Sequence, residues 1–317
     1  MGRKKTDLSA ELADLLKIEQ DPAYRRLLGN VNFTVRELGL IADHYNISID
    51  TMMRRSDDVL WLPFKLVYPM SAHSMDTLYE IVKRSIDRIG EIATEDGYSE
   101  SGSVYNSMPM EFFLFSPILM RFMFFKWGYS FIGASEFDKF SNWVLSEKFL
   151  SLGEELAANY RFQKIYYIWD RSLIWNLCWE IMDFYRANVI TEEEKREIGT
   201  ELKRILNTIE KTLNGTMIPK LPLAPEMDFY VSSQQLGFVG DYFMSEVGYG
   251  VHFQTNFSFS TIYDDQKSFE QAKNWIDSFR HISIHLSKSG RNERRIFFEE
   301  QSNIVDHILK LSDVSIY

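Results

Sequence analysis

The sequence predicts a mainly helical α+β protein: an N-terminal helix-turn-helix head followed by a mostly helical body with a small antiparallel sheet. Apolar residues recur with the helical period through most of residues 11–213. Residues 251–261 instead alternate apolar and polar side chains, which is typical of a strand with one buried face. Three prolines within residues 216–226 separate these two kinds of pattern.

The composition predicts a soluble cytoplasmic protein with no membrane partner. The chain has 317 residues, enough for two or three domains, and 45% of them are hydrophobic. The most apolar run, residues 110–132, is interrupted by Glu111 and Arg121, and the N-terminus lacks the apolar region of a secretory signal. The single cysteine, Cys178, lies in an apolar run, so we expect a buried, unpaired thiol, as in a reducing compartment.

The first elements of the head are predicted from helix start and stop signals. The sequence predicts a helix from Glu11 to Ile18, a turn over Glu19–Asp21 and a second helix from Pro22 to Leu28. Asp21 is the expected N-cap, and proline suits the first helical position because its missing N–H would be unpaired there. Gly29 and Asn30 form a helix stop signal.

An ordered set of positions runs through the head: Leu12, Ala13, Leu16, Ile18, Gly29, Phe33, Thr34, Leu38, Ile41, Ala42, Tyr45, Ile47, Ile49 and Asp50. In this order, across residues 9–53, they resemble the lambda-repressor-like domain of phage repressors and Cro proteins. Two features depart from that family. Lys17 stands where the family has a glycine, and the residues before position 9 are too few for the family's first helix.

The resemblance implies a transcription regulator whose second helix reads the major groove of double-stranded DNA. The predicted DNA contacts are Gln20, Asp21, Tyr24, Arg25, Arg26, Asn30 and Asn32. Glutamine and arginine suit base edges, whereas Arg26 could instead contact a phosphate or lie over the core of the head. Because one recognition helix reads only a few base pairs, we expect a homodimer on two half-sites.

The net charge of the chain leaves an alternative to DNA binding open. The chain carries 35 Lys and Arg against 45 Asp and Glu, a net charge of −10. Residues 1–58 hold nine of those basic and ten of those acidic residues, so their net charge is −1 and the remainder carries −9. A head that is not basic should bind phosphates weakly. The alternative is therefore a protein-interaction module whose degenerate helix-turn-helix no longer binds DNA.

The predicted domains are the head at residues 1–55 and a body at residues 59–317, with a possible sub-boundary near 216–226. Predicted helices of the body are 74–92, 110–129 with an interruption near Pro117, 137–149, 152–168, 170–188, 191–213, 266–287 and 293–311, and predicted strands are 60–68, 103–106, 228–233, 241–246 and 251–261. The body should dimerise, sense a small-molecule or protein effector, or both. Its aromatic runs are interpreted as core or as the wall of an apolar effector pocket.

No catalytic pattern is present in the sequence. It lacks a nucleophile elbow, a phosphate-binding P-loop and a dinucleotide-binding glycine motif. His281 and His285 are four residues apart on a predicted helix, which is metal-ligand spacing, but no third ligand stands nearby. Asp264 and Asp265 are interpreted as a helix N-cap. We therefore expect no enzymatic activity, no catalytic residue, no metal and no cofactor.

Overall fold

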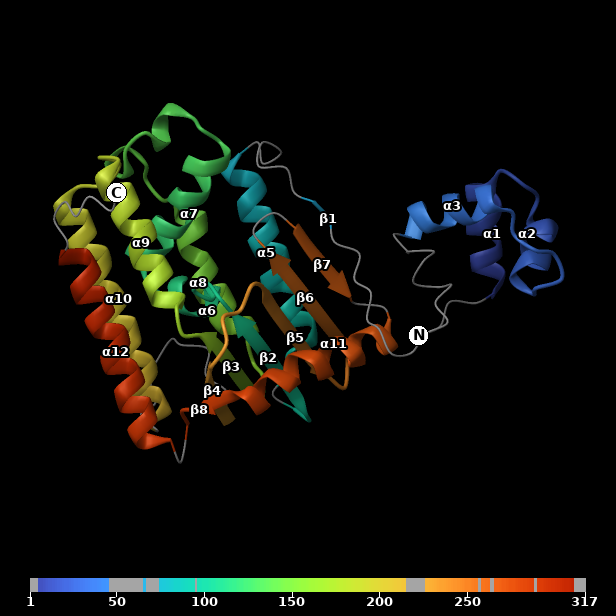
Figure 1. Ribbon diagram of the computed structural model, residues 1–317. Coiled ribbons are helices and arrows are strands. Elements are labelled where there is room, and N and C mark those ends of the chain that lie inside the picture. Colours follow the sequence, from blue (N-terminus) through green and yellow to red (C-terminus); the bar gives the residue numbers. More distant parts are fainter. Residues whose placement is uncertain are drawn as a thin grey trace. The chain divides into compact units, whose positions relative to one another are not determined.

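The computed structural model describes residues 5–45, 65–66, 74–94, 96–214, 226–255, 258–262, 265–287 and 290–310 (Figure 1). The chain divides into two compact units, Met1–Pro63 and Phe64–Tyr317, which we call the head and the body. One hydrophobic core includes Leu213 and Phe229, which flank the proline-containing segment. The predicted sub-boundary near residues 216–226 lies almost wholly outside the described residues, and the core extends on both sides of it. None of the helices within these ranges is long and apolar enough to cross a membrane.

Three helices build the described part of the head: α1 (Lys5–Leu16), α2 (Gln20–Leu27) and α3 (Val35–Tyr45). Leu12, Ala13 and Ala23 are buried between them, with Leu16, Ile18, Leu27, Phe33 and Ile41 partly buried around this small core. Helix α1 begins six residues before the predicted start at Glu11. The N-cap of α2 is Glu19, so Asp21 lies inside the first turn and the prediction that it caps the helix is wrong.

The end of α2 is a glycine-dependent turn, as the sequence predicts. Gly29 has φ +76°, in the left-handed region. Its N–H donates to the Arg26 carbonyl at 3.0 Å, and the Asn30 N–H donates to the Arg25 carbonyl at 2.9 Å. These two bonds satisfy carbonyls that the helix end would otherwise leave unpaired.

The end of α1 uses the same geometry without a glycine. The Ile18 N–H donates to the Ala13 carbonyl at 3.1 Å across Lys17. Lys17 has φ +55°, a conformation that is unfavourable for a side chain bearing a Cβ. The lysine at the position of the family's glycine is therefore held in the glycine conformation.

Paired substitutions should move the stability of the head in opposite directions. Lys17→Gly should stabilise it by up to about 1 kcal/mol, and Gly29→Ala should destabilise it by about 1 kcal/mol. No atom lies within 4 Å of a Cβ built on Gly29, so backbone strain alone is measured there. Amide hydrogen exchange of residues 5–45 in the full chain measures both changes. Protection factors that stay equal in the two variants would contradict the assignment of these turns.

The body contains an eight-stranded mixed sheet with the order β1-β7-β6-β5-β2-β3-β4-β8. Its strands are β1 (Lys65–Leu66), β2 (Ser99–Tyr105), β3 (Lys164–Asp170), β4 (Glu226–Ser232), β5 (Val239–Ser245), β6 (Tyr249–Thr255), β7 (Ser258–Ile262) and β8 (Ser283–His285). Strands β2, β3 and β4 are parallel, and every other neighbouring pair is antiparallel. The prediction of a small antiparallel sheet is corrected accordingly: the sheet is larger, and three neighbouring strands near its β8 end, β2, β3 and β4, are parallel.

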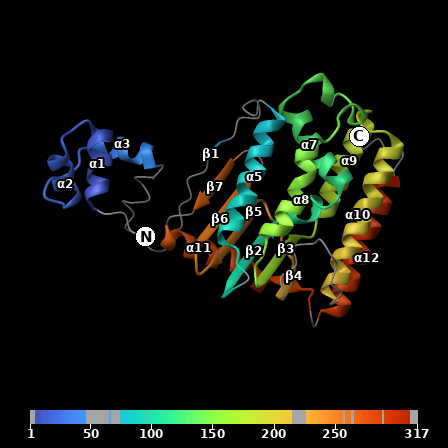
Figure 2. The same cartoon turned by 180° about the vertical axis from the view of Figure 1, so that it is seen from behind.

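The helices of the body lie on both faces of this sheet. They are α5 (Met75–Ile92), α6 (Met110–Phe113), α7 (Pro117–Phe131), α8 (Glu147–Asn159), α9 (Leu173–Arg186), α10 (Glu192–Leu213), α11 (Gln266–Ser278) and α12 (Arg291–Lys310). Helix α11 covers one face, whereas α5 and α8 cover the other, as the two opposite views show (Figure 1, Figure 2). Ser74 caps α5, and Thr191 with Glu194 forms a capping box at the start of α10.

Two predicted helices are replaced by other structure. Residues 137–149 contain short 3-10 segments, Ser135–Phe137 and Phe140–Asn142, before α8 begins. Residues 152–168 hold the end of α8 and most of β3. The strand was mistaken for a helix for a physical reason. Because β3 is buried from Ile165 to Asp170, its sequence lacks the alternation of apolar and polar residues that marks a strand with one solvent-exposed face.

Two further predictions had the wrong extent. The strand predicted at residues 251–261 is a pair of antiparallel strands, β6 and β7. The helix predicted at residues 266–287 ends at Ser278 and is followed by a 3-10 turn, Phe279–Ile282, and by β8. His281 and His285 therefore do not share a helix, and the four-residue spacing does not bring them together as metal ligands.

The aromatic runs of the body form its core, as predicted. Trp169 is fully buried, and its ring packs against Phe112 and Phe229 at centroid distances of 5.5 and 4.7 Å. Cys178 is a buried free cysteine. Burial raises the pKa of its thiol to about 12, so the thiolate is scarce at neutral pH and the predicted inert thiol follows.

Candidate nucleic-acid interface

One face of α2 is exposed along its length. Asp21, Tyr24, Arg25 and Leu28 are exposed and recur at positions i, i+3, i+4 and i+7, which places them on one side of the helix. The opposite side carries Ala23, which is fully buried against the core of the head. The helix thus presents a phenol, a guanidinium and a carboxylate to any partner.

The first residue of α2 is joined to α1. The Gln20 side-chain amide donates to Ser9 Oγ at 3.2 Å, and Ser9 is buried in α1. Gln20 therefore lies at the α1–α2 junction, next to the exposed face. This bond ties the start of α2, the predicted recognition helix, to α1.

Arg26 is engaged within the head. Its guanidinium binds the Glu37 carboxylate, with Nη2–Oε1 at 3.0 Å and Nε–Oε2 at 3.4 Å, and its Nη1 donates to the Pro22 carbonyl at 3.3 Å. Both side chains of the pair are only 16% exposed. The sequence left two roles open for Arg26, a phosphate contact or a position over the core of the head. This geometry matches the second role.

Glu37 also organises the start of α3. Its carboxylate accepts the Thr34 N–H at 2.7 Å, and Thr34 Oγ1 accepts the Glu37 N–H at 3.2 Å, which together make a capping box. The Thr34 backbone bond, followed by Arg26, holds the pKa of Glu37 below its usual value. Glu37 was not among the predicted site residues, although the Thr34–Glu37 spacing is a sequence signal for this role.

The remaining predicted contacts lie after α2. Asn30 and Asn32 are exposed in the connection to α3. Three exposed apolar side chains accompany them: Leu28, Val35 and Leu40 are 44%, 84% and 40% exposed. This surface therefore combines the amides of Asn30 and Asn32 and the guanidinium of Arg25 with apolar side chains. Such a surface could bind either DNA or a protein.

Of the two histidines at metal-ligand spacing, His285 has structural partners. His285 Nε2 lies 3.0 Å from Asp228 Oδ1 and its ring stacks on Tyr230 at 4.6 Å. Among the residues with described side chains, no group of three or more His, Cys, Asp and Glu could hold a metal ion. Asp265 caps α11 by accepting the Ser268 N–H at 3.3 Å, as predicted for this junction.

Comparison of the chain with protein-family models, with curated proteins and with solved structures found no match.

Proposed function

We propose that this protein is a cytoplasmic, sequence-specific DNA-binding transcription regulator. In this proposal α2 enters the major groove and reads base edges, while the body dimerises, senses an effector, or both. The observation that carries the proposal is the exposed face of α2, where Arg25 and Tyr24 stand outward beside the Gln20 junction. Arginine is the side chain best suited to guanine, which it contacts through two parallel hydrogen bonds.

The partners of the other predicted residues define their expected roles. Arg26, bound to Glu37, braces α2 against α3. Asn30 and Asn32 follow the helix and would contact phosphates, which set register without reading sequence. A buried, unpaired thiol at Cys178 supports a reducing compartment.

Arg25→Ala tests the reading role of α2. With a site selected from random duplexes, this variant should lose about 1–3 kcal/mol of specific binding while random DNA is affected less. Arg36→Ala is the matched control, since Arg36 is an exposed arginine on α3 rather than on α2. Titrations at a fixed low salt concentration measure both. A wild-type protein that enriches no sequence and binds no duplex would refute the proposal.

A second function is favoured by the apolar exposure. Leu28, Val35 and Leu40 would suit a protein partner, and a net charge of −1 over residues 1–58 weakens attraction to phosphates. In that case the head is an interaction module that has lost DNA binding. Retention on heparin or mixed DNA at low salt separates the two: the regulator is retained, and the interaction module flows through.

A further inference from the structure

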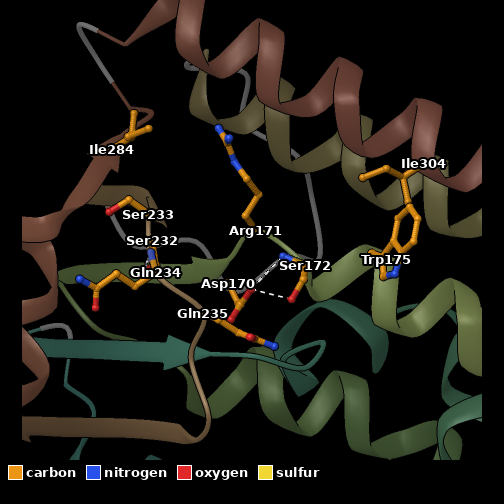
Figure 3. Close-up of a pocket in the computed structure, with 10 residues that line it drawn as sticks. All are labelled: Asp170, Arg171, Ser172, Trp175, Ser232, Ser233, Gln234, Gln235, Ile284 and Ile304. Atoms are coloured by element: carbon orange, nitrogen blue, oxygen red, sulfur yellow. Dashed lines mark hydrogen bonds between the residues drawn. The ribbon is translucent and has the colours of Figure 1, made fainter.

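A cavity of about 550 Å³ that opens widely to solvent lies in the body, where the parallel strands β3 and β4 end (Figure 3). Its walls come from the β3–α9 junction, the loop after β4, the strand β8 and the helix α12. This volume lies in the range of small-molecule sites. The carboxyl ends of parallel strands are also where ligands commonly bind in sheets with parallel strands, because several loops converge there.

The floor of the cavity is held by one buried carboxylate. Asp170 is 3% exposed, and its Oδ1 accepts the Ser172 N–H at 2.8 Å and the Ser172 hydroxyl at 2.7 Å. Its Oδ2 accepts the N–H of Leu236, in the loop between β4 and β5. The carboxylate thus ties α9 to that loop, and both of its oxygens are engaged in holding the walls.

The next residue, Arg171, is available to a ligand. It is exposed, and its side chain extends into the space between Ile284 and α12 (Figure 3). Its guanidinium has no hydrogen bond or ion pair within the described parts of the chain. The side chains of Gln234 and Gln235, across the cavity, are uncharged amides. Arg171 is therefore the charged group that a bound molecule can reach.

The opposite wall is apolar. Trp175, on the first turn of α9, is 44% exposed, and Ile304 from α12 lies beside it (Figure 3). An indole face that remains in water favours an apolar or aromatic group from a ligand. The cavity therefore combines one cationic side chain, Arg171, with an apolar wall formed by Trp175 and Ile304.

We propose that this cavity binds a small organic anion, whose carboxylate or phosphate pairs with Arg171 and whose apolar group packs on Trp175 and Ile304. A planar guanidinium matches either anion through two hydrogen bonds. A cationic ligand fits less well, because Asp170, the one carboxylate among the lining residues that the structure describes, is buried and already accepts three hydrogen bonds. The site lies wholly in the body and its occupancy does not depend on the head binding DNA.

Calorimetric titration of the full chain, without DNA, tests the site. The probes are phenyl phosphate, phenylacetate, inorganic phosphate and the uncharged benzyl alcohol. At least one of the two aromatic anions should bind more tightly than both inorganic phosphate and benzyl alcohol. The tighter of the two identifies the anionic group that the site prefers.

Variants locate the binding. Arg171→Ala should weaken the tighter aromatic anion by about tenfold or more, and Trp175→Ala should weaken it as well. Arg196→Ala is the control, because Arg196 is an exposed arginine of α10 outside the cavity lining, and it should leave binding unchanged. Circular dichroism establishes that each variant is folded.

Three results would overturn the site: no aromatic anion binding at concentrations up to about 10 mM, benzyl alcohol binding as tightly as the anions, or unchanged affinity in Arg171→Ala. Because these titrations contain no DNA, a negative result would not affect the proposal that α2 reads DNA. Likewise, refuting DNA binding by α2 would not affect the proposed anion site.

Discussion

At pH 8, Glu111→Gln should raise the free energy of unfolding of the body by up to about 3 kcal/mol. Glu111 is only 3% exposed, and its Oε2 has no hydrogen-bond partner within the described residues. Burial raises the pKa of this carboxyl to about 7, Asp241 adds to the rise, and hydrogen bonds from Tyr160 and Tyr105 oppose it. An ionised Glu111 is therefore costly to the folded state.

The sign of the pH dependence follows from this pKa. Between the ordinary glutamate pKa and about 7, the folded state keeps a proton on Glu111 that the unfolded state has lost. The contribution of Glu111 to stability is therefore largest below the ordinary glutamate pKa, and it is lost as the pH rises through about 7. Glutamine cannot ionise, so the variant should lose this decline while its stability near pH 5 changes less.

Urea unfolding at pH 5, 6.5 and 8, followed by tryptophan fluorescence, measures the effect. Six of the seven tryptophans lie in the body and none precedes residue 61, so the signal reports mainly on the body rather than on α1–α3. Glu154→Gln is the control, because it removes an exposed carboxylate of α8. If the wild type and Glu111→Gln keep the same dependence on pH, burial of an ionisable Glu111 is refuted.

Gly153→Val should destabilise the body by about 3 kcal/mol. Gly153 lies inside α8, and a Cβ placed on it would stand 2.5 Å from the carbonyl oxygen of Leu114. That oxygen belongs to the backbone at the end of α6, so no rotamer change relieves the clash. The glycine is what allows α8 to approach the α6–α7 junction.

The same fluorescence-detected urea titration measures the loss, with Gly237→Val as the control. Gly237 has no atom within 4 Å of a built Cβ, so valine there should change the stability by less than about 1 kcal/mol. Equal stabilities for Gly153→Val and Gly237→Val would show that α8 does not pack closely against Leu114.

Local signals predicted several elements of this protein correctly. Helix α5 begins directly after Ser74 and α10 directly after Thr191, each within one residue of its predicted start, and the stop signal Gly29 after α2 is left-handed. Each depends on hydrogen bonds between residues no more than five positions apart, so the chain needs no distant partner to specify it. The chain divides between Pro63 and Phe64, close to residue 59, where the body was predicted to begin.

Only part of the candidate site could be predicted from the sequence. The exposed face with Tyr24 and Arg25 follows from helical periodicity. The engagement of Arg26 by Glu37 joins residues eleven positions apart across a turn, and no periodicity places them together. The cavity beside Arg171 was not foreseen, because its walls come from four segments that only the sheet brings to one edge.

The sequence by itself determined the starts of α5 and α10, the helix stop at Gly29 and the exposed face of α2, because these depend on neighbours along the chain. Only the tertiary structure decided that residues 164–170 form a strand, since a strand buried on both faces has the same apolar run as a buried helix. It likewise decided the raised pKa of the buried Glu111 carboxyl and the contact between Tyr242 and Glu100, which are 142 residues apart. Burial and long-range contacts are properties of the packed sheet, and no short segment contains them.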